Sequence, residues 1–210
     1  MADLRIEEYN VGDIGTNCYF IVNADTKEMV IIDPGGDGAD LIRRIKERGL
    51  KLQGVLLTHG HYDHAHHARM VADAFGVSVY ASEKEKATMH DIQKNVSAMF
   101  GNPETYDADV YAKDGDVLEL AGFKIKVLST PGHTEGGCCY YFEGNKVLAS
   151  GDTLFCGSVG RTDFKGGSMS ELVRSVKEKL FVLPNDTAVL PGHEARTTIG
   201  YEKQYNMYLA

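Results

Sequence analysis

The chain has 210 residues, enough for one large domain or two small ones, and its 43% hydrophobic content is ordinary for a globular protein. Its 30 acidic and 22 basic residues give a net charge of −8 without a concentrated basic run, which argues against nucleic acid or an anionic membrane as the main partner. The start lacks an apolar signal core, and no stretch approaches the roughly 20 apolar residues of a membrane helix.

The first half of the chain alternates predicted strands and helices. Short β-rich runs between turn residues predict strands over 4–9, 17–22, 28–33 and 54–58. Apolar residues at helical spacing predict helices over 40–48 and 68–75, which end at Gly49 and Gly76.

The second half continues with a strand over 78–82 and a polar, helical to irregular stretch over 83–107. Further strands are predicted over 117–120, 123–129, 137–142, 146–150 and 187–191. The clearest helix spans 168–180, where Ser168 and Glu171 fit a capping box, and a closing helix is predicted over 197–209. Because no linker or repeat interrupts the chain, we expect a single domain, residues 1–210, of sheets covered by helices.

Four of the apolar runs end in the same chemistry, a glycine beside a potential ligand. These four short turns, called corners below, are His59-Gly60-His61, Pro131-Gly132-His133, Gly151-Asp152 and Pro191-Gly192-His193. Glycine permits the tight turns and close backbone approach that crowding ligands around one point requires, and loops just past strand ends are rigidly supported. Four such corners predict one shared site.

The first of these corners belongs to a histidine-rich segment, LLTHGHYDHAHHA (56–68), in which five histidines follow one predicted strand. His59 and His61 can be turned toward a common point by a single loop. Projection along the following helix places His64 at its start, facing the sheet, and turns His66 away. We therefore interpret His66 and His90 as solvated surface side chains, and His67 as a packing or hydrogen-bonding residue rather than a ligand.

Seven candidate ligands remain: His59, His61, Asp63, His64, His133, Asp152 and His193. Imidazole and carboxylate without thiolate suit zinc, iron or manganese, and seven ligands are too many for one tetrahedral ion. They suit two divalent ions with a shared carboxylate and a hydroxide bridging the two.

The sequence resembles the metallo-β-lactamase-fold hydrolases and, within them, the short glyoxalase II-like (hydroxyacylglutathione hydrolase-like) proteins. The matching segments are IIDPGG (31–36), THGHYDH (58–64), TPGHTEGG (130–137), SGDTLF (150–155), GRTDF (160–164) and LPGHEARTTIGYE (190–202). The resemblance implies an α/β (α+β) fold, a four-layer αββα sandwich with the metals at one edge. It also implies that no separate C-terminal substrate-binding domain is present, since 17 residues follow His193.

The resemblance also implies roles for the candidate residues. His59, His61 and His133 would hold one ion and Asp63, His64 and His193 the other, both most readily zinc, with Asp152 bridging. The implied reaction is hydrolysis of a thioester, such as a hydroxyacylglutathione, by a metal-bridging hydroxide that Asp63 also orients. Asp63 and Asp152 are thus the catalytic candidates, while Asp33 would support the site without ligating.

The chain departs from that pattern beside the site, where Ala65-His66-His67 replaces two glycines that are usual in glyoxalase II. Arg161 stands near a family lysine that contacts the glutathione carboxylate. It is predicted either to bind that carboxylate or to pair internally with Asp163. Cys156 either lines the pocket or packs as a small residue, which we favour.

Three alternatives compete with thioester hydrolysis. A persulfide dioxygenase would use one iron on His59, His133 and Asp152. A lactone or β-lactam hydrolase would use the same two-metal site, and a non-catalytic binding module or flavodiiron-like carrier would keep the metals without hydrolysis. Flavodiiron proteins carry an acidic residue where His61 stands, which argues against that branch.

The four cysteines, Cys18, Cys138, Cys139 and Cys156, have neither C-x-x-C nor disulfide-framework spacing. We therefore expect a reduced, cytoplasmic protein that acts on a small molecule, with its oligomeric state open.

Overall fold

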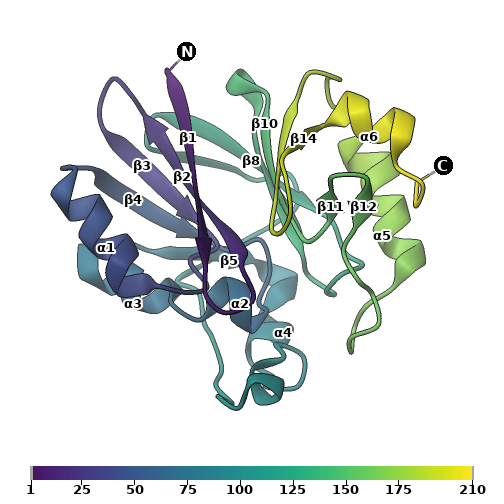
Figure 1. Ribbon diagram of the computed structural model, residues 1–210, viewed down its shortest axis with the longest axis horizontal. Helices are drawn as coiled ribbons and strands as arrows, with labels where there is room; N and C mark the ends of the chain where they lie inside the picture. Colours follow the sequence, from purple (N-terminus) through teal and green to yellow (C-terminus); the bar gives the residue numbers. More distant parts are fainter. Residues whose placement is uncertain (1, 210) are drawn as a thin grey trace.

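The computed structural model describes residues 2–209, which form two six-stranded sheets stacked between two layers of helices (Figure 1). The first sheet is ordered β1 (Leu4–Val11), β2 (Thr16–Asn23), β3 (Glu28–Ile32), β4 (Lys51–Leu56), β5 (Val79–Ser82), β6 (Val110–Ala112). The second is ordered β14 (Thr197–Thr198), β13 (Ala188–Pro191), β10 (Val147–Gly151), β9 (Cys138–Phe142), β8 (Phe123–Ser129), β7 (Val117–Leu120). A short hairpin of β11 (Leu154–Phe155) and β12 (Ser158–Val159) forms a separate two-stranded sheet beside β10 and β13.

The pairing of the strands follows the connections between them. Strands β1, β2 and β3 are joined by short turns and pair antiparallel. From β3 to β6 the strands are parallel, because α1 (Gly38–Glu47) and α3 (Ala68–Phe75) supply the crossovers from β3 to β4 and from β4 to β5, and the long segment 83–109 supplies the crossover from β5 to β6. In the second sheet the one parallel pair among the described residues is β10 with β13.

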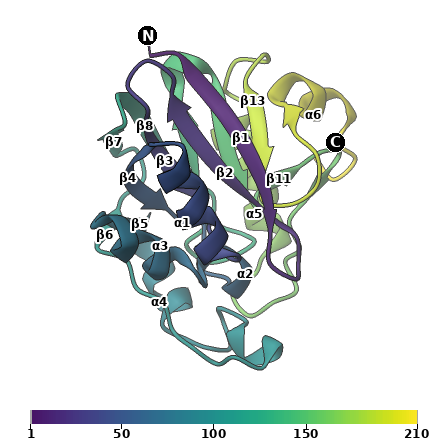
Figure 2. The same ribbon diagram turned by 60° about the vertical axis from the view of Figure 1, so that its left-hand side comes forward.

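Side chains that point alternately to the two faces of the first sheet form two of the three hydrophobic layers. On β2, Tyr19 and Ile21 point between the sheets, where they meet side chains such as Ile125 and Tyr140 of the second sheet. Phe20 belongs to the opposite layer. This layer lies on the face of the first sheet that α1 and α3 cover (Figure 2). Because successive strand residues face opposite sides, a strand buried on both faces reads as a continuous apolar run, as NCYFIV does.

The third layer lies between the second sheet and the C-terminal helices, α5 (Met169–Ser175) and α6 (Ile199–Tyr205) (Figure 1). Leu172, Val176 and Leu180 pack there against residues of β9, β10 and β13. Helix α5 is continued by one wider turn over Val176–Leu180, and its Ser168 cap accepts a hydrogen bond from the Glu171 N–H. The predicted four-layer αββα sandwich is therefore confirmed.

Several short elements differ from the prediction. Helix α2 (Tyr62–Ala65) separates the ligand loop from α3, and β6, β11, β12 and β14 were not predicted. The closing helix covers Ile199–Tyr205 instead of 197–209, because β14 precedes it and Asn206 is extended. Within 83–107, three single turns, Glu83–Glu85, α4 (Lys86–Met89) and Ser97–Phe100, lie in irregular chain, as expected.

Among residues 2–209, no helix has both the length and the apolar character required to cross a membrane.

Candidate metal centre

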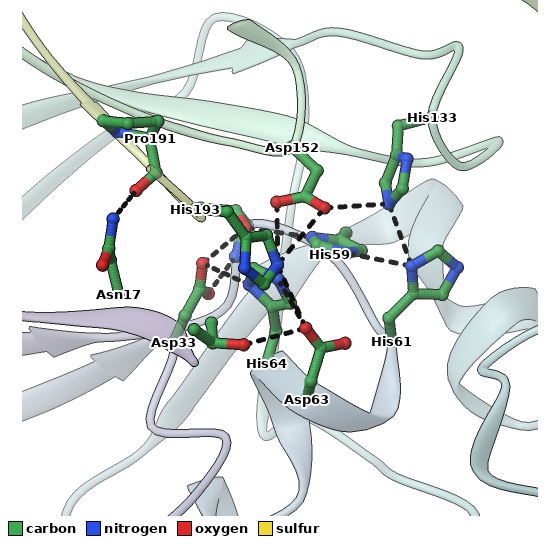
Figure 3. Close-up of polar contacts among 12 residues, drawn as sticks. Asn17, Asp33, His59, His61, Asp63, His64, His133, Asp152, Pro191 and His193 are labelled. Carbon is green, nitrogen blue, oxygen red and sulfur yellow. Dashed lines mark hydrogen bonds and ion pairs between the residues drawn. The ribbon is translucent and has the colours of Figure 1, made fainter. Parts of the chain in front are cut away.

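The four glycine corners meet at one edge of the sandwich, where the loops after β4, β8, β10 and β13 converge (Figure 3). All seven predicted ligands lie there within one cluster. Gly192 shows why glycine is required, since a Cβ at this position would collide with the Asp152 carboxylate and the His64 ring.

The first group of side chains contains three histidines. His61 Nδ1 lies 3.1 Å from His59 Nε2 and 2.9 Å from His133 Nε2. All three side chains are buried. Their nitrogen atoms therefore converge on a space of the size that one metal ion occupies.

The second group combines Asp63, His64 and His193. Asp63 Oδ2 lies 3.2 Å from His193 Nε2 and 3.4 Å from His64 Nε2. Asp152 stands between the groups, with Oδ2 3.4 Å from His133 Nε2 and Oδ1 3.4 Å from His64 Nε2 (Figure 3). One carboxylate thus faces both groups, as a bridging ligand must.

For three of the five rings, a partner on the far side fixes which nitrogen faces the cluster. His64 Nδ1 lies 3.0 Å from Asp33 Oδ2, and His133 Nδ1 lies 2.7 Å from the Arg161 carbonyl. His59 Nδ1 contacts the Thr58 hydroxyl, which in turn donates to Asp33 at 2.6 Å. Each of these rings therefore offers Nε2 to the cluster, the arrangement expected of metal-ligating histidines.

Burial and charge divide the two groups. Burial lowers the pKa of His59 and His61 well below the ordinary value, and lowers that of His133, so these rings are neutral at pH 7. Burial also opposes charge on His64, but Asp63, Asp152 and Asp33 outweigh it and raise the pKa of that ring well above its ordinary value. Surplus carboxylate charge around a buried ring marks a place suited to a cation.

Two buried polar atoms of the cluster, His64 Nε2 and Asp152 Oδ1, have no hydrogen-bond partner within residues 2–209. Unpaired buried polar atoms are costly. Both face the centre of the cluster, and both are atoms that coordinate metals. The residues present therefore fit a pair of divalent ions.

Three supporting residues were missed by the sequence reasoning. The Thr16 hydroxyl donates to Asp63 Oδ2 at 2.8 Å, and the Asn17 amide donates to the carbonyls of Pro191 and Glu194 (Figure 3). Thr58 links Asp33 to His59, as described above. The signal for Thr16 and Asn17 was their position at the start of a buried strand, where polar residues need partners.

The remaining histidines lie outside the cluster. His90 is exposed, as predicted, and His67 packs against His66 and the region of Gly38 without reaching a metal position. The prediction for His66 was wrong: it is half-buried, contacts the Glu104 carboxylate and stacks on Tyr62 with ring centroids 4.7 Å apart. Glu104 and Tyr62 therefore cover part of the ring.

A cleft of about 430 Å³ opens over the cluster, and its walls are largely apolar. Six side chains supply that apolar surface: Ile14, Val96, Phe100, Phe155, Val159 and Phe164. Arg161 also lines the cleft, with its guanidinium 4.1 Å from the centre of the Phe164 ring. Both nitrogen–oxygen contacts of Arg161 to Asp163 measure 2.7 Å, so the internal pair is present. Cys156, at the β11–β12 turn, is half-buried and does not line the cleft.

Comparisons with known proteins agree with this geometry. The chain is 38% identical to the hydroxyacylglutathione hydrolase GloC of Haemophilus influenzae, over 98% of each chain. Among solved structures, BLEG-1 B3 metallo-beta-lactamase matches with a TM-score of 0.92 and 39% identity, over 98% of this chain and 99% of that one. TTHA1623 in a di-iron-bound form matches at 0.85 and 30%, over 97% and 100%. ETHE1 from Myxococcus xanthus matches at 0.81 and 28%, over 97% and 83%.

Residues 11–193 match the sequence model of the Metallo-beta-lactamase superfamily. This match covers most of the chain and includes every residue of the cluster. The chain belongs to the metallo-β-lactamase superfamily.

Proposed function

We propose that this protein is a dinuclear metal-dependent hydrolase that cleaves a thioester, such as a hydroxyacylglutathione. The observation that carries the proposal is the pairing of a three-histidine group with an Asp63–His64–His193 group around the shared Asp152. The likeness to GloC supports the thioester, since that relative is named a hydroxyacylglutathione hydrolase.

Two divalent ions, most readily zinc, would be held by His59, His61, His133 and by Asp63, His64, His193, with Asp152 between them. Iron or manganese suits the same ligands, and the relative TTHA1623 is described in a di-iron-bound form. When bound, the ions supply a water-derived nucleophile at neutral pH and polarise the carbonyl group.

The side chains of the chain itself position the reactants. The Thr16 hydroxyl donates a hydrogen bond to Asp63 and holds its carboxylate toward the cluster. There the carboxylate can orient the attacking water. The largely apolar walls of the cleft lower the polarity around the reacting atoms, which strengthens each electrostatic interaction there. Arg161 at the cleft wall would bind a carboxylate of the glutathione moiety by exchanging it for Asp163.

A mononuclear-iron persulfide dioxygenase is the second candidate, because His59, His133 and Asp152 are all in place and ETHE1 is a structural relative. A lactone or β-lactam hydrolase is the third, favoured by the 39% identity to BLEG-1. The dioxygenase leaves Asp63, His64 and His193 without a role. For this reason we place it below hydrolysis.

A substrate panel on one metal-loaded preparation separates these candidates. We expect S-D-lactoylglutathione to be hydrolysed with a kcat/KM far above those for a β-lactam and a lactone, and glutathione persulfide to cause no oxygen uptake. Persulfide-dependent oxygen uptake without thioester cleavage would replace the proposal by the dioxygenase. Preference for a ring substrate would replace it by the third candidate.

We also place the protein in the reducing cytoplasm. All four cysteines are free thiols, and three of them, Cys18, Cys138 and Cys139, are buried as small packing residues.

A further inference from the structure

One buried carboxylate near the cluster has no place in the reaction described above. Glu85 ends the single turn Glu83–Glu85, within the stretch that the sequence marks only as polar and irregular, and its side chain is fully buried. Within residues 2–209, Glu85 and Glu202 are the two buried glutamates. Burying a carboxylate is costly unless donors compensate for the lost water, so such a residue calls for a reason.

The donors around Glu85 come from the two loops that carry the three-histidine group. Oε1 accepts the Gly60 N–H at 2.9 Å, and Oε2 accepts the Thr134 hydroxyl at 2.9 Å. Gly60 lies between His59 and His61, and Thr134 follows His133, so one carboxylate spans both ligand loops.

The backbone is shaped for this contact. A Cβ at Gly136 would collide with the backbone of Lys84 and Glu85, and a Cβ at Gly60 would collide with Met89. Helix α4 and the turn Glu83–Glu85 therefore pack directly against the two ligand loops, and glycine is required at the points of contact. Figure 1 shows α4 beside α2, which follows the first ligand loop.

We propose that Glu85 is a positioning residue that sets the distance between the loop of His59 and His61 and the loop of His133, and so tunes the metal affinity of the three-histidine group. This inference rests on the proposed metal centre. Within residues 2–209, Glu85 makes no hydrogen bond or ion pair with any of the seven ligand side chains. It acts through the backbone of Gly60 and the hydroxyl of Thr134, and the Asp63–His64–His193 group does not depend on it.

The test compares Glu85→Gln and Thr134→Val with the wild type. Glutamine keeps the size but replaces one accepting carboxylate oxygen and its charge by an NH2 group, and valine removes the hydroxyl that donates to Glu85. Zinc affinities of both sites are measured by competition with a chromophoric chelator, and the thermal unfolding of the metal-free protein is recorded in parallel. We expect zinc binding to the three-histidine group to weaken about tenfold or more in each variant, and zinc binding to the Asp63–His64–His193 group to change less than twofold.

Glu202→Gln is the matched control. Glu202 is the other buried glutamate, and it accepts hydrogen bonds from the Gly157 N–H, the Thr197 hydroxyl and the Asn206 amide, on the α6 side of the fold. Its loss should lower thermal stability while both zinc affinities stay at the wild-type level. The double variant Glu85→Gln/Thr134→Val should bind zinc no more weakly than Glu85→Gln alone, because both changes break the same link.

Wild-type zinc affinities in both Glu85→Gln and Thr134→Val, with a stability loss like that of Glu202→Gln, would overturn the inference and leave Glu85 as a purely structural residue. Equal weakening of both sites would overturn it as well. If Glu85→Gln does not fold, Thr134→Val decides alone. A wild type that binds no divalent ion would refute the metal centre itself, which the same titration reveals before any variant is compared.

Discussion

Replacing Asp33 by asparagine would reverse the hydrogen bonding behind His64 without changing the size of the side chain. Asp33 is buried and accepts the Thr58 N–H at 2.8 Å, the Thr58 hydroxyl at 2.6 Å and the proton of His64 Nδ1 at 3.0 Å. In Asp33→Asn the remaining oxygen can still accept the Thr58 N–H, so the new NH2 group faces Nδ1 of His64. The ring then avoids a donor–donor contact by moving its proton to Nε2.

That proton occupies the atom that faces Asp63 and Asp152, so His64 can no longer present a lone pair to a metal. Removing an outer partner of a ligating histidine lowers metal affinity by roughly 10–100-fold. This corresponds to about 1.4–2.7 kcal/mol. Since both side chains are buried, solvent screening does not reduce the effect.

Competition with a chelator on the purified variant measures the change. The account predicts that the ion of the Asp63–His64–His193 group is lost first, while the three-histidine group is affected less, through Thr58. Thioester turnover should fall with the occupancy of the weakened site and return at high metal concentration. An Asp33→Asn variant that binds both ions as tightly as the wild type would refute the role given to Asp33.

Three further predictions concern other residues of the site. His61→Ala removes a ligand directly, so metal affinity should fall by more than about 100-fold and activity should disappear with it. Full activity with the wild-type number of metal ions per chain would contradict the ligand assignment. Arg161→Ala should raise KM for a glutathione thioester about tenfold at nearly constant kcat, because it removes a charge-assisted contact; an unchanged KM would leave only the pair with Asp163. Burial raises the pKa of Glu85 from 4.5 to about 7, so the folded metal-free protein holds a proton that the unfolded chain releases. Its unfolding free energy should therefore fall by up to about 3 kcal/mol as the pH rises from 4.5 through 7, whereas Glu85→Gln should flatten that part of the profile; parallel profiles would contradict the shift.

The sequence predicted the ligand cluster because its signal is local and repeated. Each of the four corners pairs a glycine with a ligand at the end of an apolar run, and the helical period places His64 toward the sheet. The four-layer αββα arrangement was implied by the family resemblance, whereas the glycine–ligand corners and the apolar runs that indicate sheets covered by helices are read from the residues. These features depend on neighbours within a few positions, which one sequence displays.

The missed features depend on contacts between distant segments. Asn17 binds the carbonyl of Pro191, 174 positions away, and Glu104, which covers His66, lies 38 positions from it. The burial of Glu85 is equally invisible in a polar stretch, because its donors come from two other loops. Strands of two residues, such as β11 and β14, are too short to carry a period.

The central claim is tested most directly by the metal content of protein purified without added metal, with S-D-lactoylglutathione hydrolysis followed on the same sample. The account predicts two divalent ions of the zinc or iron class per chain, and turnover that disappears when they are chelated and returns when they are restored. A single iron per chain without thioester turnover would contradict it.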